Sequence, residues 1–204
     1  MRAVDEGFDE QIAYTQKLVS YPSQRGEEFA IQDFMYRDLA ARGFKMDRFD
    51  MDEAQLTAHE GGAPFSKDHS RAPIVVGIHH PKQETGRSLI LQHHLDVVPV
   101  GPEDMWEQAP YGGAVVGDRL YGRGTADMKG FVGIALAHVP AFLKADLKSP
   151  VHLALSYDEE VGCLGVRPML DVIKAWPVKP AMCVVGEPTR MTVMTGHKGK
   201  KSLR

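Results

Sequence analysis

Four short apolar segments constrain the fold of this chain most strongly. They are PIVVGIH (73–79), SLILQHH (88–94), VHLALSY (151–157) and AMCVV (181–185). Near-continuous apolar strands of this kind occur inside a sheet that is covered on both faces. Because segments of helical periodicity alternate with them, the sequence predicts an α/β fold, with a mainly parallel mixed sheet flanked by helices.

Four segments are expected to form the flanking helices. In residues 8–19, Phe8, Ile12 and Val19 recur at the spacing of one helix face. The other three are 27–42, which Gly43 ends, 128–144, and 168–175, which has proline in its first turn. Outside the apolar runs, strands are expected at 44–49, in a hairpin over 114–121 and at 191–195, and an irregular polar segment at 51–72.

The composition is that of a globular protein. With 43% hydrophobic residues and a formal net charge of −3 over 204 residues, it excludes a disordered tail, and no global positive field favours nucleic acid or an anionic membrane. The most apolar stretch, 130–143, is interrupted by polar residues and is shorter than the roughly 20 residues of a membrane span. Cys163 and Cys183 form no C-x-x-C pair, so we expect buried thiols in a cytoplasmic protein.

Imidazole and carboxylate side chains follow the ends of successive predicted strands. In open α/β sheets, ligands bind beyond the carboxyl ends of the strands. Four segments that bring carboxylates to one edge would repel one another unless a cation neutralised them. The sequence therefore predicts a metal site from residues at these ends: His94, Asp96, Asp127, Glu159, Glu160 and Glu187.

His94 and Asp96 form the first candidate pair. Residues two apart on a strand share a face, so Asp96 can accept a hydrogen bond from one ring nitrogen of His94 and direct the other nitrogen toward a metal. His93 is expected to point the opposite way. On spacing alone, an ordinary surface or core pair is the competing interpretation.

Each remaining carboxylate also has two interpretations. Asp127 precedes a predicted helix, so it is either a helix N-cap or a carboxylate that bridges two metals. Glu159 and Glu160 are either a solvated acidic turn or a pair in which one binds metal and the other takes a proton from water. Glu187 is a ligand or a plain turn residue. Their ordered recurrence at strand ends favours the metal site.

Four motifs carry a family resemblance. HLDVVPVG (94–101), LYGRGTADMKG (120–130), SYDEEVGCLG (156–165) and GEPT (186–189) resemble, in order, those of the M20 metallopeptidase family. The resemblance implies a di-zinc, aminopeptidase-like catalytic domain, with Co²⁺ as an alternative metal. It implies that His94 and Glu187 bind one zinc, that Glu160 binds the other and that Asp127 bridges both. Glu159 would then be the general base, and Asp96 would orient His94.

The resemblance also implies an activity and a domain organisation. The residues of these motifs are most similar to those of the family branch that releases acetate from N-acetylornithine in arginine biosynthesis. Succinyl-diaminopimelate desuccinylase, aminoacylase and carboxypeptidase activities are the alternatives within the family. Residues 1–190 would be the N-terminal segment of the catalytic domain, and 191–204 an incomplete start of a lid that makes the full-length protein a homodimer. We therefore expect this segment alone to leave an apolar face uncovered, to bind at most one metal tightly and to have little activity.

Three readings of other classes compete with this one. A non-catalytic metal-binding or interaction module is disfavoured by the intact Glu159. A dinucleotide site is suggested by Gly122-x-Gly124, but its third glycine position is Asp127, whose charge would repel a pyrophosphate. Nucleic-acid binding is the least favoured, because a few basic residues on a terminal segment are usually just solvated; they are Lys198, Lys200, Lys201 and Arg204.

Overall fold

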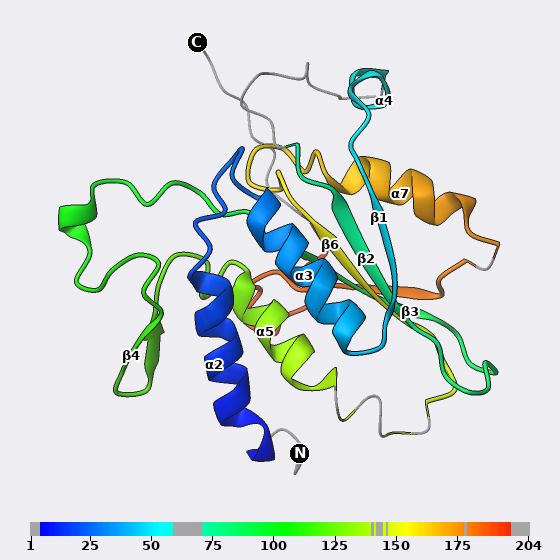
Figure 1. Cartoon of the computed structure of the whole chain (residues 1–204), viewed down its shortest axis with the longest axis horizontal. Helices are drawn as coiled ribbons and strands as arrows, with labels where there is room; N and C mark the ends of the chain where they lie inside the picture. The colour runs from blue at the N-terminus through cyan, green and yellow to red at the C-terminus, as the bar shows by residue number, and fades with distance from the viewer. Residues whose placement is uncertain are drawn as a thin grey trace.

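A five-stranded sheet forms the centre of the molecule (Figure 1). The structure is a computed structural model that describes residues 5–58, 71–139, 141, 145, 147–177 and 179–196. The strand order is β1-β2-β6-β3-β7. The strands are β1 (Lys45–Phe49), β2 (Ile74–His79), β3 (Leu89–His94), β6 (Val151–Ser156) and β7 (Met182–Val185).

Four of the five strands run in the same direction. β3 pairs in parallel with both β6 and β7, whereas β2 is antiparallel to both β1 and β6. Only β2 therefore opposes the others, which confirms the mainly parallel mixed sheet. The predicted hairpin forms a separate two-stranded sheet from β4 (Ala114–Val116) and β5 (Arg119–Tyr121).

Helices cover both faces of the sheet, as Figure 1 shows. One core packs residues of three helices against one face, through side chains such as Leu18, Met35, Val75 and Leu153. On the other face, Met169 packs against side chains from every second residue of the strands. The three helices are α2 (Phe8–Val19), α3 (Phe29–Ala41) and α5 (Lys129–Ala137); the opposite face carries α7 (Val166–Ala175).

Several element boundaries differ from the prediction. The segment expected to be irregular contains a short helix, α4 (Glu53–Ala58), although residues 59–70 lie outside the described residues. α5 begins at Lys129 and ends at Ala137, well before 144; residues 142–144 are not described. The strand expected at 191–195 is wrong, since this segment carries no strand. A 3-10 turn, η1 (Glu103–Met105), lies in the connection from β3 to β4.

The edge strand β7 is exposed, contrary to the expectation for a covered strand. Among the described residues it pairs only with β3, and all four of its residues are exposed, whereas β2, β3 and β6 are largely buried. Met182 is 64% and Val185 54% exposed, which provides the uncovered apolar face expected above. Cys163 and Cys183 are exposed too, so the prediction of buried thiols is wrong.

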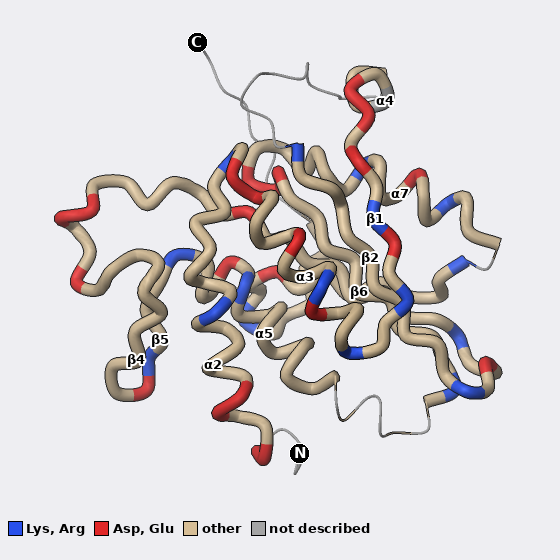
Figure 2. The backbone as a smooth tube through the Cα atoms, in the orientation of Figure 1, with Lys and Arg blue, Asp and Glu red and all other residues tan. Residues whose placement is uncertain are grey.

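The structure agrees with two expectations from the composition, which concern the distribution of charge and the absence of a long apolar helix. Acidic and basic residues are spread over many elements of the described chain (Figure 2). Among the described residues, no helix has the length and apolar character needed to cross a membrane.

Candidate metal centre

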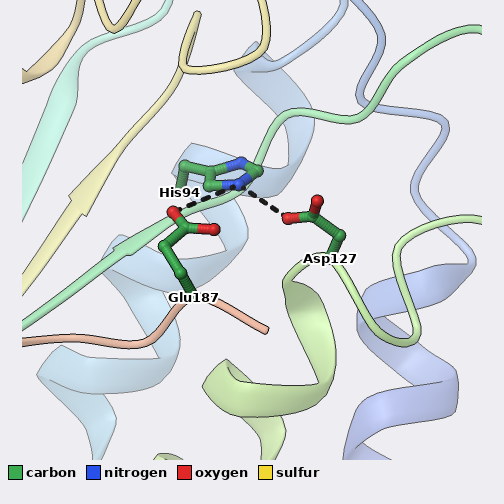
Figure 3. A group of neighbouring side chains, drawn as sticks. All are labelled: His94, Asp127 and Glu187. Carbon is green, nitrogen blue, oxygen red and sulfur yellow. Dashed lines mark hydrogen bonds and ion pairs between the residues drawn. The ribbon is translucent and has the colours of Figure 1, made fainter. Parts of the chain in front are cut away.

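Three side chains from separate segments meet beyond the carboxyl ends of the strands (Figure 3). His94 is the last residue of β3, and Glu187 follows β7, the parallel neighbour of β3, so both reach the same sheet edge. Asp127 lies just before α5. One ligand atom from each residue lies within 4.8 Å of the other two.

The distances around His94 fit a small cation. Its Nε2 atom lies 3.2 Å from Asp127 Oδ1 and 3.9 Å from both Glu187 Oε1 and Glu159 Oε2. In a tetrahedral zinc site with bonds of about 2.0–2.1 Å, neighbouring ligand atoms lie about 3.3 Å apart. The His94 side chain is fully buried, whereas that of Asp127 is 50% exposed, so the cluster opens to solvent on its carboxylate side.

Asp96 lies behind the His94 ring, as the spacing of the two residues predicts. His94 Nδ1 is 3.1 Å from the main-chain oxygen of Asp96 and 3.2 Å from its Oδ1. The main-chain N–H of His94 donates to Met128 Sδ at 3.2 Å. A proton on Nδ1 thus has acceptors on Asp96, which leaves Nε2 free to coordinate a metal.

The converging carboxylates change the pKa of His94. Burial alone would lower it, but hydrogen bonds with Asp127 and Asp96 and the charges of Asp96 and Glu159 raise the pKa to about 11. Burial also raises the pKa of Glu187. Without a metal, a proton on the imidazole therefore partly neutralises the carboxylates, and a bound divalent cation would take over that role. The donor set fits a divalent metal.

Glu159 and Glu160 have different surroundings. Glu159 Oε1 accepts a hydrogen bond from the Cys163 thiol at 3.2 Å, while its other oxygen faces His94. The main-chain N–H of Glu160 donates to Asp96 Oδ2 at 3.1 Å. Among the described residues, the Glu160 carboxylate is not brought into the group of His94, Asp127 and Glu187. Burial and the charge of Asp127 raise the pKa of Glu160 to about 7.

The helix N-cap interpretation of Asp127 is not supported. The N-cap residue of α5 is Met128, and no side chain caps this helix. The Asp127 carboxylate instead faces His94. The metal-site interpretation is the one that this geometry favours.

Metal binding at this centre should weaken steeply as pH falls. Bound metal needs a neutral His94 imidazole, so binding releases the proton that the metal-free ring holds below pH 11. One released proton makes the affinity fall about tenfold per pH unit. Between pH 8 and pH 6 we expect a loss of about 10²-fold or more in Zn²⁺ affinity, measured by chelator competition. Equal affinities at the two pH values would contradict the assignment.

Gly186, which follows β7, allows the backbone to pack closely against His93 and Met128 beside the metal centre. A Cβ atom there would lie 2.6 Å from Nδ1 of the buried His93 and 2.9 Å from Met128 Cε. Because His93 and His94 are consecutive residues of β3, the His93 side chain leaves the opposite face of the strand, as predicted. Burial and the charge of His94 lower the pKa of His93 to about 4, and neither ring nitrogen has a hydrogen-bond partner among the described residues. A Cβ at this position would therefore force the buried His93 ring or the Met128 side chain to move.

Gly186→Ala is expected to destabilise the protein by about 1–3 kcal/mol, the usual cost of overpacking a core. It should also displace the adjacent Glu187 and weaken metal binding. Urea unfolding of the metal-free protein gives the first effect, and chelator competition the second. Gly196→Ala is the control, because a Cβ there meets nothing within 4 Å. Equal stability of the two variants would show that Gly186 has no packing role.

Sequence reasoning missed three residues that support the centre. Met128 and Cys163 contact His94 and Glu159 as described above. Lys129 is fully buried, and its Nζ donates to the main-chain oxygen of Tyr21 at 2.6 Å. The only signal in the sequence was the position of Lys129, a lone cation between Met128 and the apolar helix that follows it.

The fold and the site together define an α/β domain with a candidate metal centre at its strand ends. The family of this domain follows from comparison with known proteins. Residues 90–197 match the model of peptidase family M20/M25/M40, and the chain belongs to this family. The matched segment contains all six residues that the sequence singled out.

Two curated relatives and one solved structure are similar to this chain. The chain is 28% identical over 201 residues to succinyl-diaminopimelate desuccinylase of Acidovorax ebreus, covering 95% of this chain and 49% of the relative. It is 37% identical over 111 residues to acetylornithine deacetylase of Aliivibrio fischeri, covering 54% of this chain and 28% of the relative. The structure of human carnosine dipeptidase 1 shares the fold, with a TM-score of 0.72 and 22% identity over 90% of this chain and 39% of its own. The chain thus spans about half the length of the desuccinylase and less than half the length of the other two proteins.

Proposed function

We propose that the protein hydrolyses the amide bond of an N-acylated amino acid at a divalent metal centre. The observation that carries this proposal is the buried His94 imidazole, whose Nε2 has three separate carboxylates within 3.9 Å at the strand ends. Neutral and anionic N and O ligands of this kind suit Zn²⁺, with Co²⁺ as an alternative.

We propose His94, Asp127 and Glu187 as metal ligands from this geometry, and Glu160 from the resemblance of its motif to the family. His94 and Glu187 would hold one metal, Glu160 a second, and Asp127 would bridge the two. Asp96 would orient His94 through Nδ1. When bound, such metals supply Lewis-acid chemistry that lowers the pKa of water and polarises an amide carbonyl.

Glu159 is proposed as the general base. Its Oε2 faces the cluster, where it can accept a proton from the attacking water and later donate it to the nitrogen of the departing amine. The Cys163 thiol holds the other oxygen, Oε1, and so limits rotation of the carboxylate. Glu159 is also 33% exposed at its side chain, so the proton can exchange with solvent between turnovers.

N-acetylornithine is the first substrate to test, with ornithine and acetate as products. The higher identity, 37%, is to an acetylornithine deacetylase. N-succinyl-diaminopimelate is the second, because the similarity to a desuccinylase extends over nearly the whole chain. We also propose that residues 1–190 form the N-terminal segment of the catalytic domain, and that 191–204, of which 197–204 lie outside the described residues, begin a lid domain through which the full-length protein dimerises.

The test is an assay of the full-length, zinc-loaded protein against N-acetylornithine and N-succinyl-diaminopimelate. Release of free amine is measured with and without prior chelation. We expect turnover of at least one substrate, its loss with chelator and its return with Zn²⁺. Two results would contradict the proposal. One is turnover that chelation leaves unchanged, and the other is a failure to hydrolyse these two compounds, other N-acyl amino acids or dipeptides.

A further inference from the structure

The segment between α2 and α3 contacts both loops that carry candidate ligands. Residues 21–23 (Tyr21-Pro22-Ser23), here named the 21–23 connector, follow the C-terminal end of α2. Ser23 Oγ donates to the main-chain oxygen of Leu95 at 2.5 Å, and the N–H of Val97 donates to the main-chain oxygen of Ser23 at 3.0 Å. These bonds flank Asp96 on both sides, so they hold the segment that begins with His94.

Lys129 connects the same connector to the other loop. Its Nζ donates to the main-chain oxygen of Tyr21 at 2.6 Å, two residues before Ser23. Its aliphatic chain packs under the glycine-rich turn, where a Cβ at Gly124 would come within 3.1 Å of Lys129 Cδ. Because Lys129 is two residues from Asp127, this bond fixes the start of α5 relative to the connector.

The buried amino group of Lys129 is not needed to fill space. Lys129 is fully buried, and burying a polar amino group costs free energy that an apolar side chain of similar length, such as methionine, would not incur. Beside a charge interaction with Asp96, lysine adds the hydrogen bond to the connector. Ser23, 1% exposed, is likewise a buried donor whose hydroxyl reaches a main-chain oxygen beside the site.

We infer that the 21–23 connector is a positioning element which, through Lys129 and Ser23, sets the separation of His94 and Asp127. Lys129 and Ser23 touch neither ligand atom and act through the two loops. This inference rests on the proposed metal centre. It adds that the affinity and geometry of the centre depend on a segment more than 70 residues before the first ligand in the sequence.

The test compares Lys129→Met and Ser23→Ala with the wild type in the full-length protein. Zn²⁺ affinity is measured by chelator competition, and the visible spectrum of bound Co²⁺ reports ligand geometry. We expect Lys129→Met to weaken Zn²⁺ binding about 10–100-fold, as loss of an outer partner usually does, and to change the Co²⁺ spectrum. Ser23→Ala should change both readouts in the same direction. Lys174→Met is the matched control, because Lys174 is 72% exposed in the last turn of α7, and it should match the wild type in both readouts.

The outcomes separate this inference from the proposed function. If the wild type binds no Zn²⁺ tightly, the proposed metal centre fails and the inference fails with it. If the wild type binds Zn²⁺ and Lys129→Met stays within twofold of it with an unchanged Co²⁺ spectrum, only the inference is overturned. Should Lys129→Met not fold, Ser23→Ala decides: an affinity within twofold of the wild type overturns the inference, and a clear loss supports it.

Discussion

Replacing Glu159 by glutamine in the full-length protein is expected to lower kcat by about 10²–10⁴-fold, the usual contribution of a general base. Glutamine has nearly the same shape, and its side-chain oxygen can still accept the Cys163 hydrogen bond. It cannot take a proton from water. Because Glu159 is not a proposed ligand, Zn²⁺ content and KM should change little. Steady-state kinetics and metal analysis of the same preparation measure both effects.

Glu10→Gln is a suitable control for the Glu159 variant. Glu10 is exposed on α2, far along the chain from every candidate ligand, so this variant should match the wild type in kcat and in metal content. If Glu159→Gln retained more than about a tenth of the wild-type kcat with full metal content, Glu159 would not be the base. A matching loss of metal would instead assign Glu159 to the ligand set.

Asp127→Asn should cause the largest loss of metal affinity. Asp127 Oδ1 is the carboxylate atom closest to His94 Nε2 among the measured pairs of the cluster, at 3.2 Å, and the proposed bridge needs both oxygens with full charge. We expect Zn²⁺ affinity to fall by more than 10²-fold, beyond the 10–100-fold that loss of an outer partner costs. Activity at limiting Zn²⁺ should fall in parallel. Chelator competition and turnover measure the two effects.

Asp118→Asn provides the matched control for Asp127. Asp118 lies exposed in the β4–β5 turn, so the same chemical change there should leave metal binding and activity intact. An Asp127→Asn variant that bound Zn²⁺ as tightly as the Asp118→Asn variant would exclude Asp127 as a ligand. The thermal stability of the metal-free variants separates a loss of ligand from a loss of fold.

The parts of the site that could be predicted from the sequence follow from strand geometry. Asp96 lies two residues after His94, just beyond the end of β3, and its Oδ1 is 3.2 Å from His94 Nδ1. His93 and His94 are consecutive residues of β3, so their side chains leave opposite faces of the strand. Glu187 meets His94 because parallel neighbours end at the same edge. These rules depend only on residue spacing and strand direction, which the apolar runs already indicate.

Other features depend on packing between distant segments and could not be predicted. The strand order β1-β2-β6-β3-β7 is not deducible from the apolar runs, since each of them fits any interior position. Lys129 is a basic residue at the start of a helix, where a solvated side chain is expected. The Tyr21 carbonyl, 108 residues earlier, instead accepts a hydrogen bond from it in the interior. Cys183 lies on a strand with an interior pattern that the structure places at an exposed edge.

The proposed function depends on His94, Asp127 and Glu187 binding a metal together. An anomalous difference map at the zinc absorption edge, from crystals of the full-length protein loaded with Zn²⁺, tests it most directly. We expect a strong peak about 2.0–2.2 Å from His94 Nε2 and from an oxygen of both Asp127 and Glu187. A map with no peak among these three residues, or with zinc bound only elsewhere, would contradict it.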